Sequence, residues 1–423
     1  MKILVIGGGG REHAITQSIV KSKLCSKVFV LPGNAGTATI GENILGDVND
    51  FNLIKNVVLS NQISVVFVGP EDPIVNGIYD FFKQDNLLKD ILIIAPGKTA
   101  AQLEGSKDFA KVFMKKNKIP TAKHSTFSKD NIKEAYAFLE AMNPPYVLKA
   151  DGLAAGKGVL IIDNLNEAKQ ELENMLINEK FGTASNRVVI EEFLDGIELS
   201  CFVLTNGKDY KILPLAKDYK KIGEGDTGLN TGGMGAVSPV PFVDEKFKMK
   251  LEEQIIKPTI NGIQEEGMDY VGFVFIGLIK VNEEPYVIEY NVRMGDPETE
   301  VVFPRIQSDI LELFLSLETE QFPLLELKID PRYASTIMLV SGGYPKAYEK
   351  NIPIAGLDDV NQSIVFHAGT KRLNNTIVTN GGRVLAITSF GDTINIATEN
   401  SYEQIQKISF EGMYCRKDIG FDL

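Results

Sequence analysis

Short apolar runs separated by longer, mixed stretches dominate the first hundred residues. Runs at residues 3–6, 28–31, 64–68 and 91–95 are each followed by a turn that contains Gly or Pro. Runs of this length predict buried strands, and the stretch 11–21 predicts a helix after the first strand. Strands that alternate with helices indicate a parallel, doubly wound sheet, which binds ligands at the carboxyl ends of its strands.

A helical stretch follows at 101–118, the pattern changes after residue 120 to a smaller α+β arrangement, and short strands begin at about residue 334. We expect helices at 101–118, 130–142, 247–262 and 308–317, and strands at 146–150, 159–162, 187–193 and 270–281. A chain of 423 residues is too long for one core. We therefore predict an α/β substrate-binding domain (1–101), a middle domain (102–327) with a lid at about 121–193, and a mostly β C-terminal domain (328–423).

A strand expected at residues 285–291 carries the first candidate chemistry. Strict alternation would place Val287, Glu289 and Asn291 on one face of this strand. A carboxylate and a carboxamide side by side suit Mg²⁺, which takes one or two protein oxygens and completes its shell with phosphate and water. Arg293 follows two residues later and is expected near the same site. The alternative is a half-buried strand whose polar side chains only face solvent.

The four glycines at 7–10 form a turn between the first strand and its helix. The bare amides of Gly9 and Gly10 at a helix start can hold an anion. A dinucleotide fingerprint would need a third glycine at position 12, which is Glu12, so NAD is disfavoured and a sugar phosphate is favoured. A tight turn without a ligand is the alternative. Glu71 follows another strand, where it could accept bonds from sugar hydroxyls or cap a turn.

A second glycine-rich loop, DGLAAGKG at 151–158, links two predicted strands. It is superficially like a phosphate loop, but its spacing is one residue short and a strand follows it. We interpret it as a hairpin loop that closes over phosphates, with Lys149 at the end of the preceding strand; an ordinary flexible hairpin is the alternative.

The segment from Lys217 to Ala236 is rich in glycine and polar residues. A loop of this length inside a compact domain is more often functional than idle. In the C-terminal region, Lys371 and Arg383 each lie close to glycines and are candidates for binding a substrate phosphate. His367 is expected to pack rather than to catalyse.

Composition narrows the class of protein. A formal charge of −12 and a pI near 5.0 repel phosphate backbones, which disfavours nucleic acid as a partner. The longest apolar runs are too short to span a membrane, and the N-terminus reads as a buried strand rather than a signal peptide. Three cysteines without metal or disulfide spacing fit a reducing compartment, so we expect a cytoplasmic protein.

The assembled motifs resemble the ATP-grasp superfamily, and within it the phosphoribosylamine–glycine ligase family, over essentially the whole chain. The matching segments are GGREHA at 9–14, PGNAGT at 32–37, LEGSK at 103–107, residues 149–158, NTGGMGA at 230–236, RMGDPE at 293–298 and CRKDIG at 415–420. The departures are Met294, Tyr219 and Lys221, where the family more often has Leu or Phe, His and Arg. The first should alter packing only, and the others concern the role of that loop.

The resemblance implies an ATP-grasp fold and an enzyme of de novo purine biosynthesis. It would join glycine to 5-phosphoribosylamine through a glycyl phosphate, with ATP, Mg²⁺ or Mn²⁺, as a monomer or weak homodimer. Motifs and resemblance together give catalytic candidates (Arg293, Lys149, Asp218), ATP-binding candidates (Lys107, Lys149, Gly152, Gly156, Lys157, Gly158, Glu191, Glu192, Glu198), substrate-binding candidates (Gly9, Gly10, Glu71, Asn230, Thr231, Gly232, Gly233, Arg293, Asp296, Lys371, Arg383) and metal ligands (Glu289, Asn291).

Two other functions stay open at this point. One is an ATP-grasp ligase for a different acid or amine, which would share the nucleotide site but differ around residues 218–236. The other is a non-catalytic nucleotide-binding regulator. The presence of Glu289, Asn291, Lys149 and Arg293 disfavours the regulator, because a sensor needs affinity but no complete phosphoryl-transfer site.

Overall fold

The N-terminal sheet is parallel and has the order β3-β2-β1-β4-β5, in a computed structural model that describes residues 1–153 and 158–423. Its first strand alternates between two hydrophobic clusters, with Leu4 and Ile6 in one and Ile3 and Val5 in the other. Both faces are therefore covered, as the apolar runs predicted. The elements are β1 (Lys2–Gly7), α1 (Gly10–Val20), β2 (Lys27–Pro32), α2 (Thr37–Ile40), β3 (Glu42–Asn43), α3 (Phe51–Asn61), β4 (Val65–Val68), α4 (Glu71–Val75), α5 (Ile78–Gln84) and β5 (Leu92–Ile94).

The lid region forms an antiparallel sheet of order β6-β9-β7-β8. It has a hydrophobic cluster of its own, built around Leu139, Leu148 and Leu172. Because this cluster shares no residue with the others, the lid packs as a separate unit. The elements are β6 (His124–Ser128), η1 (Lys129–Asn131), α8 (Ile132–Glu140), β7 (Tyr146–Ala150), β8 (Val159–Ile162), α9 (Leu165–Leu176), η2 (Gly182–Asn186) and β9 (Arg187–Glu192).

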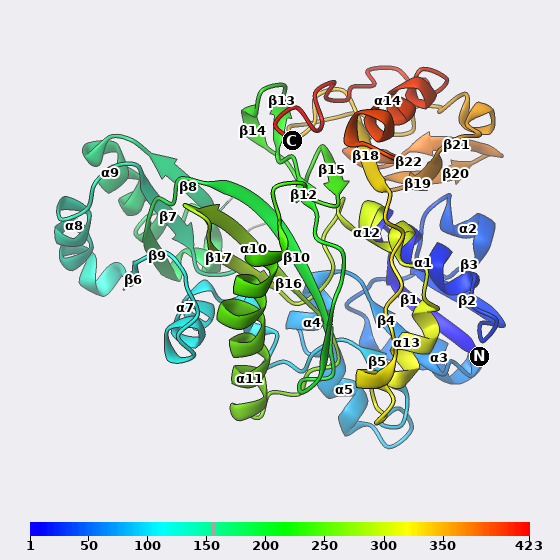
Figure 1. The fold of residues 1–423 in the computed structure, drawn as a ribbon, viewed down its shortest axis with the longest axis horizontal. Helices are drawn as coiled ribbons and strands as arrows, with labels where there is room; N and C mark the ends of the chain where they lie inside the picture. The colour runs from blue at the N-terminus through cyan, green and yellow to red at the C-terminus, as the bar shows by residue number, and fades with distance from the viewer. Residues whose placement is uncertain (154–157) are drawn as a thin grey trace.

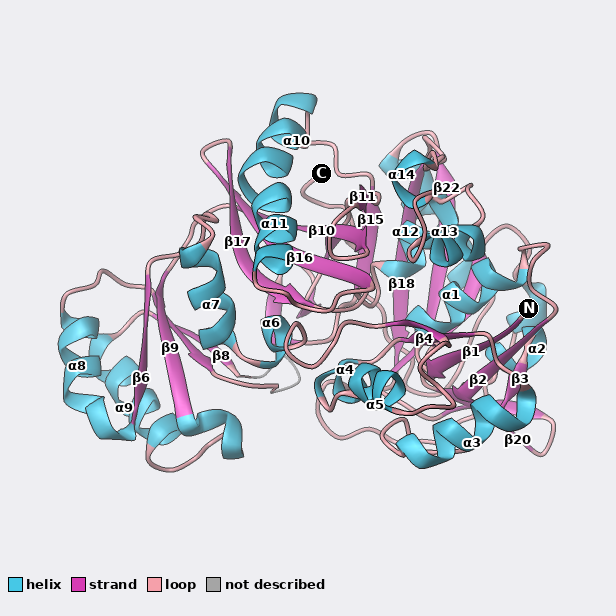
Figure 2. Ribbon diagram, turned by 90° about the horizontal axis from the view of Figure 1, so that it is seen from below, coloured by secondary structure: helices cyan, strands magenta, loops and turns pink. Residues whose placement is uncertain are grey.

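A central antiparallel sheet, of order β11-β10-β16-β17, lies between the lid and the N-terminal sheet (Figures 1 and 2). Its inner residues, such as Val274 and Phe273, belong to the same two clusters as the first strand of the chain. The elements of this region are α6 (Gln102–Gly105), α7 (Lys107–Lys116), β10 (Ile197–Thr205), β11 (Tyr210–Ile212), α10 (Glu245–Leu251), η3 (Glu252–Ile256), α11 (Lys257–Glu265), β16 (Gly272–Val281), β17 (Glu284–Asn291), α12 (Thr299–Arg305), α13 (Ile310–Ser316) and η4 (Phe322–Leu324).

The last sheet, of order β12-β15-β18-β22-β19, takes two of its strands from the middle of the chain. The glycine-rich segment after Lys217 supplies them, together with the hairpin β13-β14. The elements are β12 (Lys217–Asp218), β13 (Lys221–Gly223), β14 (Thr227–Asn230), β15 (Gly235–Ser238), β18 (Tyr333–Val340), η5 (Leu357–Asp359), β19 (Ile364–His367), β20 (Thr370–Leu373), β21 (Thr376–Thr379), β22 (Arg383–Gly391) and α14 (Ile394–Ile405). The expected fold class, α/β and α+β with a small C-terminal domain rich in antiparallel strands, is confirmed.

Three local predictions were wrong. The helix expected at 101–118 is interrupted at Ser106, whose backbone is extended, and the helix expected at 247–262 contains a π-helical turn, η3. In β17 the pairing with β16 shifts between Glu289 and Val287, so Ile288 is an extra residue at a bulge. Val287 therefore turns into the core instead of sharing a face with Glu289.

Ser106 ends one helix and starts the next. Its hydroxyl accepts a hydrogen bond from the Phe109 amide at 3.1 Å and donates one to Asp151 Oδ1 at 2.9 Å. We expect Ser106→Ala to lower the free energy of unfolding by about 1 kcal/mol, because it removes an N-cap. Chemical denaturation would measure this, with Ser60→Ala, near the exposed end of α3, as the control. An equal loss in both variants would contradict the capping role.

Across residues 1–153 and 158–423, none of the helices combines the length and apolar character that crossing a bilayer requires.

Candidate active site

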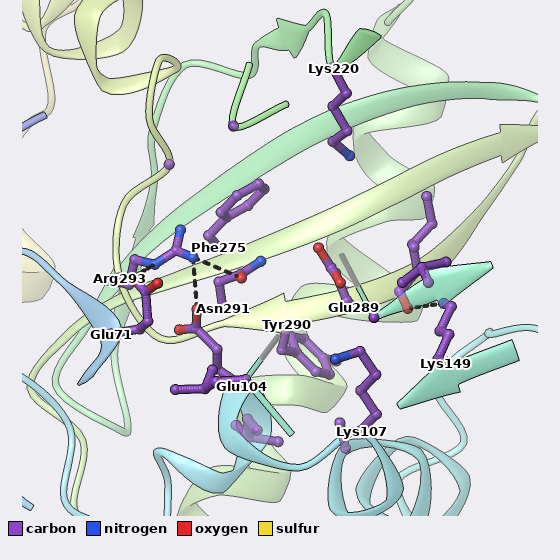
Figure 3. A pocket seen from close by; sticks show the side chains of 18 of the residues that line it. Glu71, Glu104, Lys107, Lys149, Lys220, Phe275, Glu289, Tyr290, Asn291 and Arg293 are labelled. Atoms are coloured by element: carbon purple, nitrogen blue, oxygen red, sulfur yellow. Dashed lines mark hydrogen bonds and ion pairs between the residues drawn. The ribbon is translucent and has the colours of Figure 1, made fainter. Parts of the chain in front are cut away.

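A cavity of about 500 Å³ opens between the lid sheet, β17, α7 and the segment after β12. It collects candidates that lie far apart in the sequence. The predicted residues that line it are Glu71, Lys107, Lys149, Gly152, Gly158, Glu191, Asp218, Thr231, Gly232, Glu289, Asn291, Arg293, Asp296 and Arg383. Figure 3 shows Glu289 near the middle of the site, with Arg293 toward one end and Lys149 toward the other.

Glu289 and Asn291 reach the cavity from the same strand, as expected for a metal pair. The described residues contain no group of three or more acidic, His or Cys side chains arranged around one metal position. Two hard oxygen donors still fit an ion that shares its shell with substrate phosphates and water. The buried Asn291 Nδ2 has no hydrogen-bond partner within residues 1–153 and 158–423, while its Oδ1 accepts a bond from Arg293 at 3.2 Å.

Arg293 is held by two carboxylates from different elements. Its Nη2 donates to Glu104 Oε1 at 2.7 Å, and its Nε lies 3.4 Å from Glu71 Oε2. The other oxygen of Glu104 accepts a hydrogen bond from the Val292 amide at 2.8 Å. These contacts fix the guanidinium beside the Asn291 side chain. Glu104 was named before only as part of a family motif, because nothing in its local pattern pointed to a role in the site.

Lys149 shares the Glu191 carboxylate with a second lysine that sequence reasoning missed. Lys149 Nζ lies 2.9 Å from Glu191 Oε2, and Lys111 Nζ lies 3.1 Å from Glu191 Oε1. All three side chains are buried. Burial lowers the pKa of Lys111 to about 8, although Glu191 opposes the shift. Burial also disfavours the charged Glu191, but the two lysines hold its pKa below the usual value.

A second cluster of charges is formed by residues of the glycine-rich segment and of strand β10. Lys220 Nζ lies 3.0 Å from Glu198 Oε2, and the nearby Asp218 and Glu198 raise the pKa of Lys220. Burial raises the pKa of Asp218. Glu298 also lines the cavity, and burial, followed by the charge of Asp218, raises its pKa to about 7. Neither Lys220 nor Glu298 was a sequence candidate, because only the fold brings them together.

Arg383, from β22, contacts two other segments of the chain, one at Gly232 and one at Asp296, and all three residues line the cavity. Its Nη2 lies 2.9 Å from Asp296 Oδ1, and its Nη1 donates to the carbonyls of Gly232 at 2.6 Å and Asp296 at 2.7 Å. The glycine turn is adjacent, since the Arg11 amide lies 3.4 Å from Asp296 Oδ2. The Gly9 amide already donates to Glu12 Oε2 at 2.6 Å.

Several sequence candidates do not line this cavity. Among the described residues, the candidates that lie outside the cavity lining are Gly9, Gly10, Glu192, Glu198, Asn230, Gly233 and Lys371. Glu192 accepts a hydrogen bond from the Lys123 amide, and Lys371 lies in the β20-β21 hairpin. Gly156 and Lys157 fall outside the described residues.

His13 and His367 pack against each other beside the glycine turn, with ring centroids 5.7 Å apart. The His13 Nδ1 accepts a hydrogen bond from the His367 amide at 2.8 Å. Burial lowers the pKa of His13 to about 3 and that of His367 to about 4. Both rings therefore stay neutral in the folded protein at pH values where an unfolded histidine becomes charged.

Because the unfolded state binds these protons first, stability is lost as pH falls below about 6.5. We expect each ring to contribute a loss of about 1 kcal/mol per pH unit between pH 6 and pH 4.5. Urea denaturation across this range would measure the slope, and His13→Gln should make it shallower. The two proteins should show equal slopes above pH 7.5. An unchanged slope below pH 6 would show that His13 does not titrate on unfolding.

Comparison with known proteins shows the family of the chain. Models of phosphoribosylglycinamide synthetase match the chain in three parts: the N domain at residues 1–104, the ATP-grasp (A) domain at 105–299 and the C domain at 334–422. Phosphoribosylamine–glycine ligase of Caldanaerobacter subterraneus is 42% identical over 419 residues, covering 99% of both chains. That of Vibrio parahaemolyticus is 43% identical over 426 residues, covering 100% of this chain and 98% of the relative.

Solved structures give the same result. The crystal structure of phosphoribosylamine–glycine ligase from Thermotoga maritima matches with a TM-score of 0.84 and 34% identity, covering 99% of this chain and 100% of that one. The biotin carboxylase domain of Hydrogenobacter thermophilus 2-oxoglutarate carboxylase, solved with MgADP, shares the fold at a TM-score of 0.73 and 16% identity, over 98% of this chain and 91% of that one. By these matches over its full length, the chain belongs to the phosphoribosylamine–glycine ligase family, whose fold is the ATP-grasp fold.

Proposed function

We propose that this protein joins glycine to 5-phosphoribosylamine, with conversion of ATP to ADP and phosphate, in purine biosynthesis. Family membership over the whole chain supports this activity. The observation that carries it is one cavity lined by Glu289, Asn291, Lys149 and Arg293. These side chains supply oxygen donors for a metal and positive charge within one cavity, which is what phosphoryl transfer to a carboxylate requires.

The ATP end of the cavity is proposed to lie between the lid and α7. Lys107 lines it from α7 and Lys149 from β7, and Gly152 and Gly158 flank the segment that would cover the phosphates. Glu191 holds Lys149 in place, while Glu192 and Glu198 follow on the same stretch of chain toward the proposed adenine and ribose positions. Mg²⁺ or Mn²⁺ would be held by Glu289 and Asn291 and would neutralise charge on the transferred phosphoryl group.

The chemistry needs no protein nucleophile. A carboxylate is a poor electrophile, so the glycine oxygen would first take the γ-phosphoryl group to form glycyl phosphate, and the ribosylamine nitrogen would then displace phosphate. Arg293 is placed to bind the glycine carboxylate or the transferred group, since it is fixed beside Asn291. Closure of the loop would exclude water from the acyl phosphate.

We place the ribosyl phosphate at the end of the cavity formed by Arg383, Asp296, Thr231 and Gly232. Asn230 and Gly233 flank these lining residues, and the turn at Gly9 and Gly10 adjoins Asp296. Lys371 lies in the β20-β21 hairpin, outside the cavity lining among the described residues. The domain limits at 101 and 327, a cytoplasmic location and a monomeric or weakly dimeric state belong to the same proposal.

The test is ADP release from ATP and Mg²⁺ with glycine, with and without freshly generated phosphoribosylamine. We expect turnover to need both substrates, to give glycinamide ribonucleotide, and to stop when EDTA removes the metal. Replacing Mg²⁺ with Mn²⁺ should restore it. Turnover with a different amino acid would keep the reaction type and change the substrate. ATP binding without turnover on any substrate pair would contradict the proposal.

A further inference from the structure

Glu298 is a cavity-lining acid that the proposed function does not yet use. Its side chain is buried, and it precedes helix α12. The Ser200 hydroxyl on β10 donates to Glu298 Oε1 at 3.0 Å. A Cβ added at Gly295 would lie 2.4 Å from Glu298 Oε2, so this oxygen lies directly over Gly295, which also lines the cavity.

Four other acids of the cavity pair with cations. Glu191 is shared by two lysines, Glu104 and Glu71 hold Arg293, and Asp296 pairs with Arg383. Such pairing stabilises the charged carboxylate. Burial raises the pKa of Glu104 despite its pairing, but both oxygens of Glu104 already accept hydrogen bonds, from Arg293 and from the Val292 amide. Among the described residues, the lining acids without a cation within 4.0 Å are Glu289, Asp218 and Glu298. Glu289 is the proposed metal ligand. The strongest charge acting on Asp218 is the positive Lys220, whereas the strongest charge acting on Glu298 is the negative Asp218.

We propose that Glu298 is the general base that accepts a proton from the amine of phosphoribosylamine when its nitrogen attacks glycyl phosphate. In this step the C–N bond forms, and the bond from the acyl carbon to the phosphate oxygen breaks with its electron pair leaving on phosphate. The proton released by nitrogen passes to Glu298 Oε2. This inference rests on the proposed function and adds to it the group that removes the amine proton.

The surroundings of Glu298 suit this role. Asp218 and Lys220 from the glycine-rich segment interact with Glu298 through their charges, and Ser200 from β10 donates a hydrogen bond to it. Glu300 from α12 and Arg383 from β22 are the other charged groups that interact with it. Burial and the Asp218 charge raise its pKa to about 7, while Ser200 and Lys220 oppose the rise. A base with a pKa near the working pH accepts protons efficiently and is still available in its charged form.

The first experiment separates the two half-reactions. Hydroxylamine, a strong nucleophile that needs little help from a base, would trap glycyl phosphate as glycine hydroxamate. We expect Glu298→Gln to lower formation of glycinamide ribonucleotide by about a hundredfold or more and to keep hydroxamate formation within about threefold. Glu312→Gln on the exposed side of α13 is the matched control and should change neither rate.

Three outcomes would overturn the assignment or its basis. An equal fall in both products would mean that Glu298 acts before the amine attacks, and an unchanged amide rate would mean that it is not the base. If the wild-type protein forms neither product, the proposed function itself fails, which is a distinct result.

A second experiment does not depend on the folding of Glu298→Gln. Ser200→Ala removes a hydrogen bond to the charged carboxylate, so the acidic limb of the turnover profile for amide formation should move to higher pH by about one unit. The ionisation of the substrate amine is identical in the two proteins, and hydroxamate formation should show no such shift. An acidic limb that stays in place would refute the proposal.

Discussion

Arg293→Lys is expected to lower turnover by about a hundredfold to a thousandfold and to leave the Michaelis constant for ATP within about threefold. The guanidinium reaches Glu104, Glu71 and Asn291 at once, at 2.7, 3.4 and 3.2 Å. A lysine ammonium is a single point of charge on a flexible stem and cannot keep this fork. Because Lys149 and Lys107 lie toward the other end of the cavity, ATP should still bind.

Steady-state kinetics with glycine, ATP and phosphoribosylamine would measure this split between turnover and affinity. Arg332→Lys provides a matched control, since Arg332 is half exposed and pairs with Asp330 at 2.7 Å away from the cavity. The control should keep wild-type turnover. If Arg293→Lys also does, the role of Arg293 in charge stabilisation is wrong.

Glu191→Gln is expected to destabilise the protein by about 3–5 kcal/mol at pH 7, because it leaves two buried lysines without their shared carboxylate. The unpaired Lys111 should then lose its proton more readily than it does in the wild-type protein. Since the unfolded state would bind more protons than the folded state, the stability deficit should shrink as pH rises from 7 toward 9.

Thermal and urea unfolding of Glu191→Gln, Lys111→Met and the double variant would form a thermodynamic cycle. We expect the double variant to recover part of the loss, because one buried charge is removed with its partner. Glu192→Gln, the neighbouring acid whose side chain is about one third exposed, should cost less than about 1 kcal/mol. Additive losses in the double variant would show that the lysines and Glu191 are not coupled.

The fold followed from local patterns wherever neighbouring residues decide the structure. The apolar runs at 3–6 and 28–31 form parallel strands, because side chains on both faces of such strands are apolar and must be buried. Local patterns failed where one residue changes the geometry. Ser106 divides a helix by capping the next one, and the bulge at Ile288 turns Val287 away from the face of Glu289.

The residues of the candidate site also fall into two groups, those that local patterns predicted and those that they did not. Glu289 and Asn291 were found because two residues of one strand share a face, and Lys149 and Gly152 because a loop follows its strand. Glu104, Lys111 and Glu298 gave no such signal. Arg293 and Glu104 are 189 positions apart, and Ser200 and Glu298 are 98 apart, yet each pair is joined by a hydrogen bond.

Periodicity and contiguous motifs were enough to predict the strand and helix order, the family, and a pair of oxygen donors on one strand, Glu289 and Asn291, that line the cavity together. Which acids pair with cations, and which acids, such as Glu298 and Asp218, have a raised pKa, could be learned from the folded arrangement alone. The physical reason is that burial and ion pairing act over a few ångströms in space, and those distances are set by packing between sheets rather than by neighbours in the chain.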